Sequence, residues 1–196
     1  MSFEVRHMPD DSDAAVIARS LADPELFGEL FDRHWPAVYR YCRSRAGTDG
    51  EDLAAETFRL AFDRRATYEL DRPDARPWLL GLATNLIRNH LRSCSRGTRA
   101  LERLAEAGSV DDPTDTIIER TEAAQLGPTL AQALDGMPSR DRDALLLFAW
   151  NDLSYEEVGV ALNVPVGTVA SRISRARLQL RARLAELGCR PEQTGS

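Results

Sequence analysis

Apolar residues recur at intervals of three and four along almost the whole chain, and this spacing constrains the fold more than any other feature. Alternating β-branched segments, which would indicate strands, are scarce. Asp23 and Pro24 are typical of a helix start, and Pro36 should kink or restart the helix that follows. The apolar residues of that first helix are Leu26, Phe27, Leu30, Phe31, Val38, Tyr41 and Cys42. The chain is therefore expected to be all-α.

The same spacing predicts helices from Glu51 to Asp63 and from Trp78 to Arg96, and helical structure again from Pro128 to about Leu187. The intervening stretch is acidic and is interrupted by Gly108 and Pro113, which is typical of a linker. We therefore expect a flexible N-terminal segment, a first helical domain, an acidic linker, a helix-turn-helix domain and a disordered tail. Their expected bounds are 1–20, 21–96, 97–127, 128–187 and 188–196.

Composition narrows the class of protein. The 196-residue chain has a net charge of -6, no apolar run near the ~18 residues of a membrane helix and an acidic start without a signal peptide, so a cytoplasmic location is expected. Three separated cysteines favour reduced thiols. His90 and Cys94 could share a helix face, but two ligands do not make a zinc site. No Ser-His-Asp set, phosphate loop or metal cluster supports an enzyme, so no catalytic residue, metal or cofactor is expected.

The C-terminal stretch concentrates positive charge. Ser154 and Glu157 form a capping box that begins one helix, residues 163–165 end it, and Pro165 begins another. That second helix would bury Val169, Ile173, Ala176, Leu180 and Leu184. It would expose Thr168, Ser171, Arg172, Arg175 and Gln179, with Arg177, Arg181 and Arg183 on the flanks. Residues 165–185 contain five arginines and no carboxylate, whereas a merely solvated helix usually mixes signs. The pattern predicts a helix-turn-helix that reads the major groove.

The helix predicted at 78–96 also has a polar arc. Its inward arc is Leu80, Ala83, Leu86, Ile87, Leu91 and Cys94. Its outward arc is Trp78, Asn85, Arg88, Asn89, Arg92 and Arg96, and the adjoining loop adds Tyr68 and Arg76. An aromatic ring among amides and arginines suits single-stranded nucleic acid. Trp78 is equally well interpreted as a core anchor at the helix start.

The preceding helix has an acidic outward face formed by Asp52, Glu56 and Asp63. Such a face would repel DNA, so its partner would be a protein. An ordinary solvated face explains the same pattern and is favoured when these residues are considered alone.

Together these segments resemble a bacterial RNA polymerase sigma factor of the compact extracytoplasmic-function type, which has only conserved regions two and four. "EDLAAETFRLAF" is similar to region 2.2, so the resemblance implies that Asp52, Glu56, Arg59 and Asp63 dock on the β′ clamp helices of the polymerase. "RPWLLGLATNLIRNHLRSCSR" is similar to regions 2.3 and 2.4, which melt and read the minus-10 element. "LSYEEVGVALNVPVGTVASRISRAR" is similar to region 4.2, which reads the minus-35 element.

The resemblance implies core RNA polymerase, through its β′ and β subunits, promoter DNA and an anti-sigma protein as partners. It also implies that the linker runs toward the active-site and RNA-exit channels. The sequence departs from the family at Ala55, where glutamine is frequent, and at Asn89-His90, where aspartate-histidine is frequent. The alternative function is a stand-alone helix-turn-helix regulator, which would leave the Trp78 and Asp52 faces unexplained.

Overall fold

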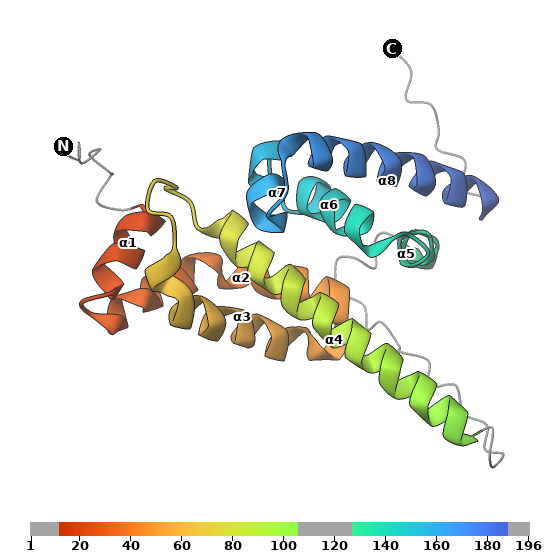
Figure 1. The fold of residues 1–196 in the computed structure, drawn as a ribbon, viewed down its shortest axis with the longest axis horizontal. Helices are drawn as coiled ribbons and strands as arrows, with labels where there is room; N and C mark the ends of the chain where they lie inside the picture. The colour runs from red at the N-terminus through yellow and green to blue at the C-terminus, as the bar shows by residue number, and fades with distance from the viewer. Residues whose placement is uncertain (1–11, 106–126, 188–196) are drawn as a thin grey trace.

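The computed structural model describes residues 12–105 and 127–187, and every regular element within these two ranges is helical (Figure 1). The α-helices are α1 (Asp13–Ser20), α2 (Phe27–Ala46), α3 (Gly50–Arg64), α4 (Arg76–Ala105), α5 (Gly127–Asp135), α6 (Ser139–Trp150), α7 (Tyr155–Leu162) and α8 (Val166–Glu186). Short 3-10 helices occupy Pro24–Leu26, Gly47–Asp49 and Arg65–Thr67. The all-α prediction is confirmed.

Helices α2, α3 and α4 pack on one another to form the first domain. Leu30, Val38, Leu80 and Ile87 are buried at their centre. The helix does not restart at Pro36, since α2 continues without interruption from Phe27 to Ala46. Pro36 lies on the exposed side of the helix, while Leu30 and Val38 before and after it are held in the core, so packing keeps the two halves of α2 in one helix.

The N-terminal segment predicted to be flexible contains a packed helix. Ser12 caps α1 by accepting a hydrogen bond from the backbone N–H of Ala15 at 3.2 Å. Ala14, Val16 and Ile17 are fully buried. An isolated helix of this length is unstable in water, so contacts with α2 stabilise it. The prediction of flexibility for 1–20 is therefore wrong from Asp13 onward, and residues 1–11 lie outside the described part.

Helix α4 extends beyond the predicted end at Arg96 to Ala105, into the segment predicted as linker. Its C-terminal half projects past α2 and α3 (Figure 1), which explains why Cys94 is exposed although the sequence places it on the inward arc. Among the helices of 12–105 and 127–187, none covers this part of α4. The rest of the predicted linker, 106–126, with the acidic residues Asp111, Asp112 and Asp115, lies outside the described residues, as does the tail at 188–196.

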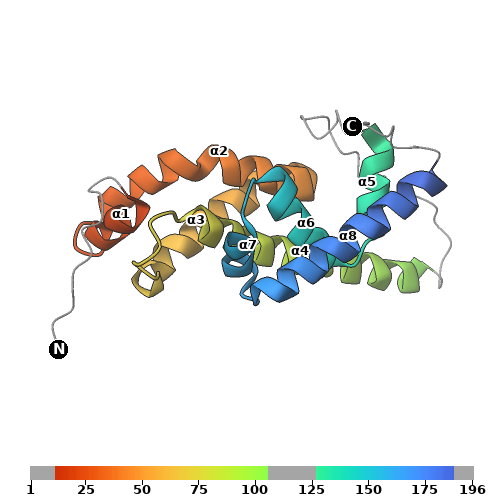
Figure 2. The ribbon, with the colours of Figure 1, turned by 90° about the horizontal axis from the view of Figure 1, so that it is seen from above.

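The second domain consists of α5 to α8, with Leu147, Val158, Val169 and Ile173 at its centre. It packs directly on the first domain, because α7 lies against α4 (Figures 1 and 2). The approach is close enough that a methyl group on Gly81 of α4 would overlap the backbone of Ala161 in α7. One continuous cluster of buried apolar residues therefore spans both domains.

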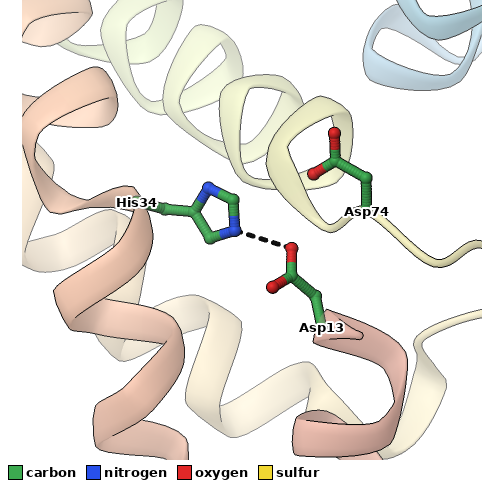
Figure 3. A group of neighbouring side chains, drawn as sticks. All are labelled: Asp13, His34 and Asp74. Carbon is green, nitrogen blue, oxygen red and sulfur yellow. Dashed lines mark hydrogen bonds and ion pairs between the residues drawn. The ribbon is translucent and has the colours of Figure 1, made fainter. Parts of the chain in front are cut away.

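A polar junction ties α1 to the first domain (Figure 3). The buried carboxylate of Asp13 lies 2.6 Å from His34 Nε2 and 3.2 Å from Arg33 Nη1, and it accepts a hydrogen bond from the N–H of Ala75 at 2.9 Å. Asp74 brings a third potential metal ligand within 4.8 Å of the other two. Because Arg33 already faces Asp13 and both Asp13 oxygens are hydrogen-bonded, we interpret the group as a structural junction between α1, α2 and the start of α4.

The charge on Asp13 should contribute to stability. Burial raises the pKa of its carboxyl, but hydrogen bonds from His34, Ala75 and Arg33 outweigh burial and hold the pKa below the ordinary value. A group with a lowered pKa stabilises the fold above its unfolded pKa, near 4, and loses this effect as the pH falls through the folded pKa. We expect Asp13→Asn to lower the free energy of unfolding by about 1–3 kcal/mol at pH 7.

Urea unfolding of both proteins between pH 2 and pH 7 measures this difference, which should shrink toward zero at the acidic end. Asp32→Asn removes the same charge from an exposed position on α2 and serves as the control, with an expected change of less than about 0.5 kcal/mol. A gap between Asp13→Asn and the unaltered protein that stayed constant down to pH 2 would contradict the linkage.

Candidate nucleic-acid interface

Helices α7 and α8 form the predicted helix-turn-helix. Ser154 Oγ accepts from the N–H of Glu157 at 3.2 Å, and the Glu157 carboxylate accepts from the N–H of Ser154 at 2.7 Å, which completes the capping box. Asn163 ends α7 in the left-handed conformation, with φ at 50°. The N–H of Val164 then returns to the carbonyl of Gly159 at 3.0 Å. This turn fixes the angle at which α8 leaves α7.

The structure brings all seven residues predicted for minus-35 recognition onto α8. Ser171, Arg175, Arg177 and Arg181 are exposed, and Thr168, Arg172 and Gln179 are half-buried. The buried seam on the opposite side agrees with the prediction at Val169, Ile173 and Ala176, which are fully covered. The polar arc is therefore a real surface of the folded chain.

Two arginines of this arc already have partners within the domain. Arg175 donates from Nε and Nη2 to the two carboxylate oxygens of Asp141 in α6, at 3.1 and 3.0 Å, and this pair raises the pKa of the guanidinium. The guanidinium of Arg177 lies 5.1 Å from the ring centre of Phe148. Neither contact could be predicted from the sequence, because Asp141 and Phe148 lie about 30 positions earlier and belong to another helix.

The predicted minus-10 residues are divided by their exposure. Asn85, Asn89, Arg92 and Arg96 are exposed along α4, whereas Arg76, Trp78 and Arg88 are half-buried and Tyr68 is buried. The Tyr68 hydroxyl donates to the carbonyls of Arg72 and Asp74, at 2.8 and 3.1 Å, and its ring lies 5.0 Å from that of Trp78. Burial raises the pKa of the Tyr68 hydroxyl. Tyr68 is thus buried against Trp78 and does not share its exposed surface, and Trp78 is both packed on the core and partly exposed.

Arg88, which was predicted to contact DNA, is paired with a carboxylate of the second domain. Its Nε lies 2.5 Å from Asp143 Oδ2 in α6, and the other oxygen of Asp143 accepts from Arg45 Nη2 of α2 at 2.7 Å. The Asp143 side chain is fully buried. The sequence offered no signal for this contact, since Asp143 lies in the other domain, 55 residues beyond Arg88.

The acidic face of α3 remains exposed. Arg59 bridges Glu56 and Asp63, with N–O distances of 2.6 and 2.8 Å, and its hydrogen bond lowers the pKa of Glu56. Asp52 is exposed and makes no ion pair within the described residues. Arg59 is therefore part of a charged ladder along the helix, and Asp52 is left as its free negative end.

A cavity of about 500 Å³ lies where the two domains meet. The loop before α4 and Trp78 form one wall, and α7 with the turn that follows it forms the other. The cavity is lined by Thr67, Tyr68, Glu69, Arg72, Trp78, Glu156, Gly159, Val160, Asn163, Val164, Pro165 and Val166.

None of the helices in 12–105 and 127–187 has the length and hydrophobicity needed to cross a membrane.

Farther along α4, His90 Nε2 lies 3.0 Å from Asp49 Oδ2 and 3.5 Å from Cys94 Sγ. Burial raises the pKa of the other described thiol, that of Cys42, to about 12, so it stays protonated at neutral pH.

Comparison with known families gives two matches, to Sigma-70 region 2 over residues 30–97 and to Sigma-70, region 4 over residues 129–180. The chain is 37% identical over 163 residues to the ECF RNA polymerase sigma factor SigE of Mycolicibacterium smegmatis. That match covers 81% of this chain and 61% of SigE, so the chain spans less than two thirds of that relative's length. It is 33% identical over 137 residues to the RNA polymerase sigma-H factor of Pseudomonas aeruginosa, covering 66% of this chain and 69% of that protein.

Among solved structures, CnrH in complex with the cytosolic domain of CnrY has a similar fold, with a TM-score of 0.64 and 26% sequence identity. The similarity covers 90% of this chain and 99% of CnrH. The matched region 2 contains α3 and most of α2 and α4, and the matched region 4 contains most of α5 to α8, so each region lies within one packed domain.

Proposed function

The chain belongs to the sigma-70 family of RNA polymerase sigma factors, in its extracytoplasmic-function group, and on that premise we propose that it directs core RNA polymerase to promoters through two DNA-reading surfaces. The observation that carries the proposal is the presence of both regions on one chain, each with an exposed polar face that contains arginines. A stand-alone helix-turn-helix regulator would need only the second of these regions.

The polar arc of α8 is the proposed minus-35 reader. Its seven residues extend over nearly four turns, which suits one passage through the major groove. Arg175 and Arg172 would supply the bidentate contacts to guanine edges, and Arg181 a phosphate contact. The pairing of Arg175 with Asp141 supports this role, because two hydrogen bonds to a fixed carboxylate orient the guanidinium before DNA arrives.

The outward face of α4 is the proposed minus-10 reader. Its exposed amides and arginines, Asn85, Asn89, Arg92 and Arg96, would contact bases and phosphates of a separated strand. Trp78, half-buried against Tyr68, would contact a base of that strand with the exposed part of its ring. The domain bounds proposed from the sequence are kept, with the N-terminal limit moved to Asp13 to include α1 and the linker starting after Ala105.

The acidic ladder on α3 is the proposed docking surface for the β′ clamp helices of core polymerase. Considered alone, these residues favour an ordinary solvated face. Because the chain belongs to the sigma-70 family, we now favour a docking face. We further propose that the chain has no catalytic activity of its own, acts in the cytoplasm and is held inactive by an anti-sigma protein. The structure of CnrH with the cytosolic domain of CnrY supports the last point, because it is a complex of a relative with a second protein.

The role of Arg175 can be tested on purified holoenzyme. We expect Arg175→Ala to relax the base preference at one minus-35 position and to weaken promoter binding by about 1–3 kcal/mol. Arg181→Ala should weaken binding to all sequences alike. Binding of the holoenzyme to a randomised minus-35 library, read by sequencing, measures both effects.

Arg175→Lys separates DNA reading from stability, because lysine keeps a positive charge beside Asp141 but lacks the two-pronged geometry. It should reproduce the loss of base preference with little change in melting temperature. Retention of the full preference in both Arg175 variants would show that another residue reads that position.

The docking surface is tested by charge reversal. We expect Asp52→Arg combined with Glu56→Arg to abolish binding to core polymerase while leaving the melting temperature unchanged, because both residues lie on the exposed side of α3. Co-purification with core enzyme measures binding. Glu69→Arg combined with Asp71→Arg makes the same charge change in the exposed loop before α4 and should bind core normally. Full core binding by the Asp52 and Glu56 variant would exclude this face.

A further inference from the structure

We propose that Asp49, His90 and Cys94 form a binding site for Zn²⁺, or for a divalent cation of similar chemistry, which would join α4 to the turn between α2 and α3. The sequence alone offers only His90 and Cys94, on one helix, and two ligands do not make a zinc site. The structure adds a third group, Asp49, from about 40 positions earlier in the chain. None of the three belongs to the surfaces assigned to DNA or polymerase, so the site goes beyond the proposed function.

The three side chains meet at one atom, Nε2 of His90. Asp49 Oδ2 lies 3.0 Å from this nitrogen, and Cys94 Sγ lies 3.5 Å from it. Zinc bonds of about 2.0–2.3 Å at tetrahedral angles place nitrogen, oxygen and sulfur ligands about 3.4–3.6 Å from one another. Both distances from Nε2 are therefore close to those in a tetrahedral site. Asp49 and Cys94 are exposed and would close the third side by rotating about their Cα–Cβ bonds.

His90 by itself satisfies its two neighbours only in part. Nε2 carries at most one hydrogen, which can be directed either at Asp49 or at Cys94. A cation in place of that hydrogen would bind the imidazole nitrogen, the carboxylate and the sulfur at the same time. The thiol would lose its proton to solvent, because the thiolate is the form that binds metal.

The set of ligand atoms selects the kind of cation. Sulfur and imidazole favour zinc over Ca²⁺ and Mg²⁺, which prefer oxygen. The group at Asp13 contains no sulfur, and its carboxylate is already engaged by Arg33 and by the N–H of Ala75. Three protein ligands at the new site would leave the fourth position of a tetrahedral zinc to water.

The backbone holds the ligands in place before any cation binds. Asp49 ends the short helix Gly47–Asp49, which begins at a glycine with φ of 57°. The next residue, Gly50, is packed so closely that a methyl group on it would overlap the backbone of Arg43 in α2. His90 and Cys94 are four residues apart on α4 and so share one face of that helix. Two ordered elements thus supply the ligands, which reduces the ordering needed on binding.

The site is open to solvent. The side chains of His90 and Asp49 are 26% and 53% exposed, and Cys94 is exposed, so a cation can enter without unfolding of the chain. The thiol of Cys42, by contrast, is buried in the core. An occupied site would link α4 to the start of α3 and would stabilise the folded chain by mass action.

Three variants each remove one ligand from the full chain, which is prepared without a histidine tag. They are Asp49→Asn, His90→Gln and Cys94→Ser. Asp49→Asn is the most informative, because it leaves the two ligands on α4 unchanged and tests the contact that only the tertiary structure creates. Circular dichroism and melting without metal verify that each variant is folded.

Matched controls make the same changes away from the site. Asp32→Asn alters an exposed carboxylate on α2. His7→Gln and Cys189→Ser alter a histidine and a cysteine that lie outside the described residues. All three should bind zinc as the unaltered chain does.

Zinc affinity is measured by competition with a colorimetric chelator, and Co²⁺ serves as a spectroscopic substitute. We expect one zinc ion per chain. His90→Gln and Cys94→Ser should weaken binding by about 100-fold, since loss of an outer partner of a metal ligand alone costs about 10–100-fold. Asp49→Asn should weaken it by about tenfold, because an amide oxygen is uncharged. The Co²⁺ form should show a thiolate-to-metal charge-transfer band that Cys94→Ser lacks.

Zinc at a hundredfold excess over its Kd should raise the melting temperature of the unaltered chain by about 5 °C. Mg²⁺ at the same concentration should leave it unchanged. The three ligand variants should show a smaller rise with zinc, and the three controls the full rise.

Unchanged zinc affinity in Asp49→Asn would overturn the site, and so would failure of the unaltered chain to bind zinc or the absence of the thiolate band from its Co²⁺ form. These measurements use the free chain without polymerase or DNA. Promoter-dependent transcription with core polymerase tests the proposed function separately, so failure of one can be distinguished from failure of the other.

Discussion

The structure depends on a buried carboxylate shared between two domains. A charged group removed from water destabilises a protein unless partners of opposite charge and hydrogen-bond donors surround it. Asp143 meets this condition only while α6 lies against α2 and α4, because Arg45 and Arg88 come from those two helices. The position of the second domain on the first, and with it the cavity beside Trp78, is therefore tied to two ion pairs as well as to apolar contacts.

Arginines on the proposed functional surfaces are also paired with carboxylates of the same chain. Within the described residues, Arg59 is paired along α3, Arg175 is paired with Asp141, and Arg88 with Asp143. Each pair restrains the arginine side chain in one orientation, which reduces the side-chain entropy lost when a ligand binds. A phosphate must compete with Asp143 for Arg88, and Asp141 offsets part of the positive charge of Arg175, so nonspecific attraction to DNA is limited.

Short-range rules account well for the individual elements. The capping box at Ser154, the end of α7 at residues 163–165 and the division of α8 into a buried and an exposed side were all evident from the sequence. Failures occurred where a segment depended on distant contacts. α1 is too short to be stable alone. α2 continues through Pro36 because both of its halves pack in the same core. Cys94 is exposed because α4 extends beyond α2 and α3.

By itself, the sequence determined the all-helical class, the helix-turn-helix, the two polar arcs and the resemblance to a sigma factor, because helix periodicity, caps and motifs depend on residues a few positions apart. Only the tertiary structure decided which side chains of those arcs are accessible. Tyr68 is buried against Trp78, and Arg88 is paired with a carboxylate 55 residues away. Such contacts form when helices that are distant in the sequence pack together. The local pattern of one helix does not specify which residue of another helix will contact it.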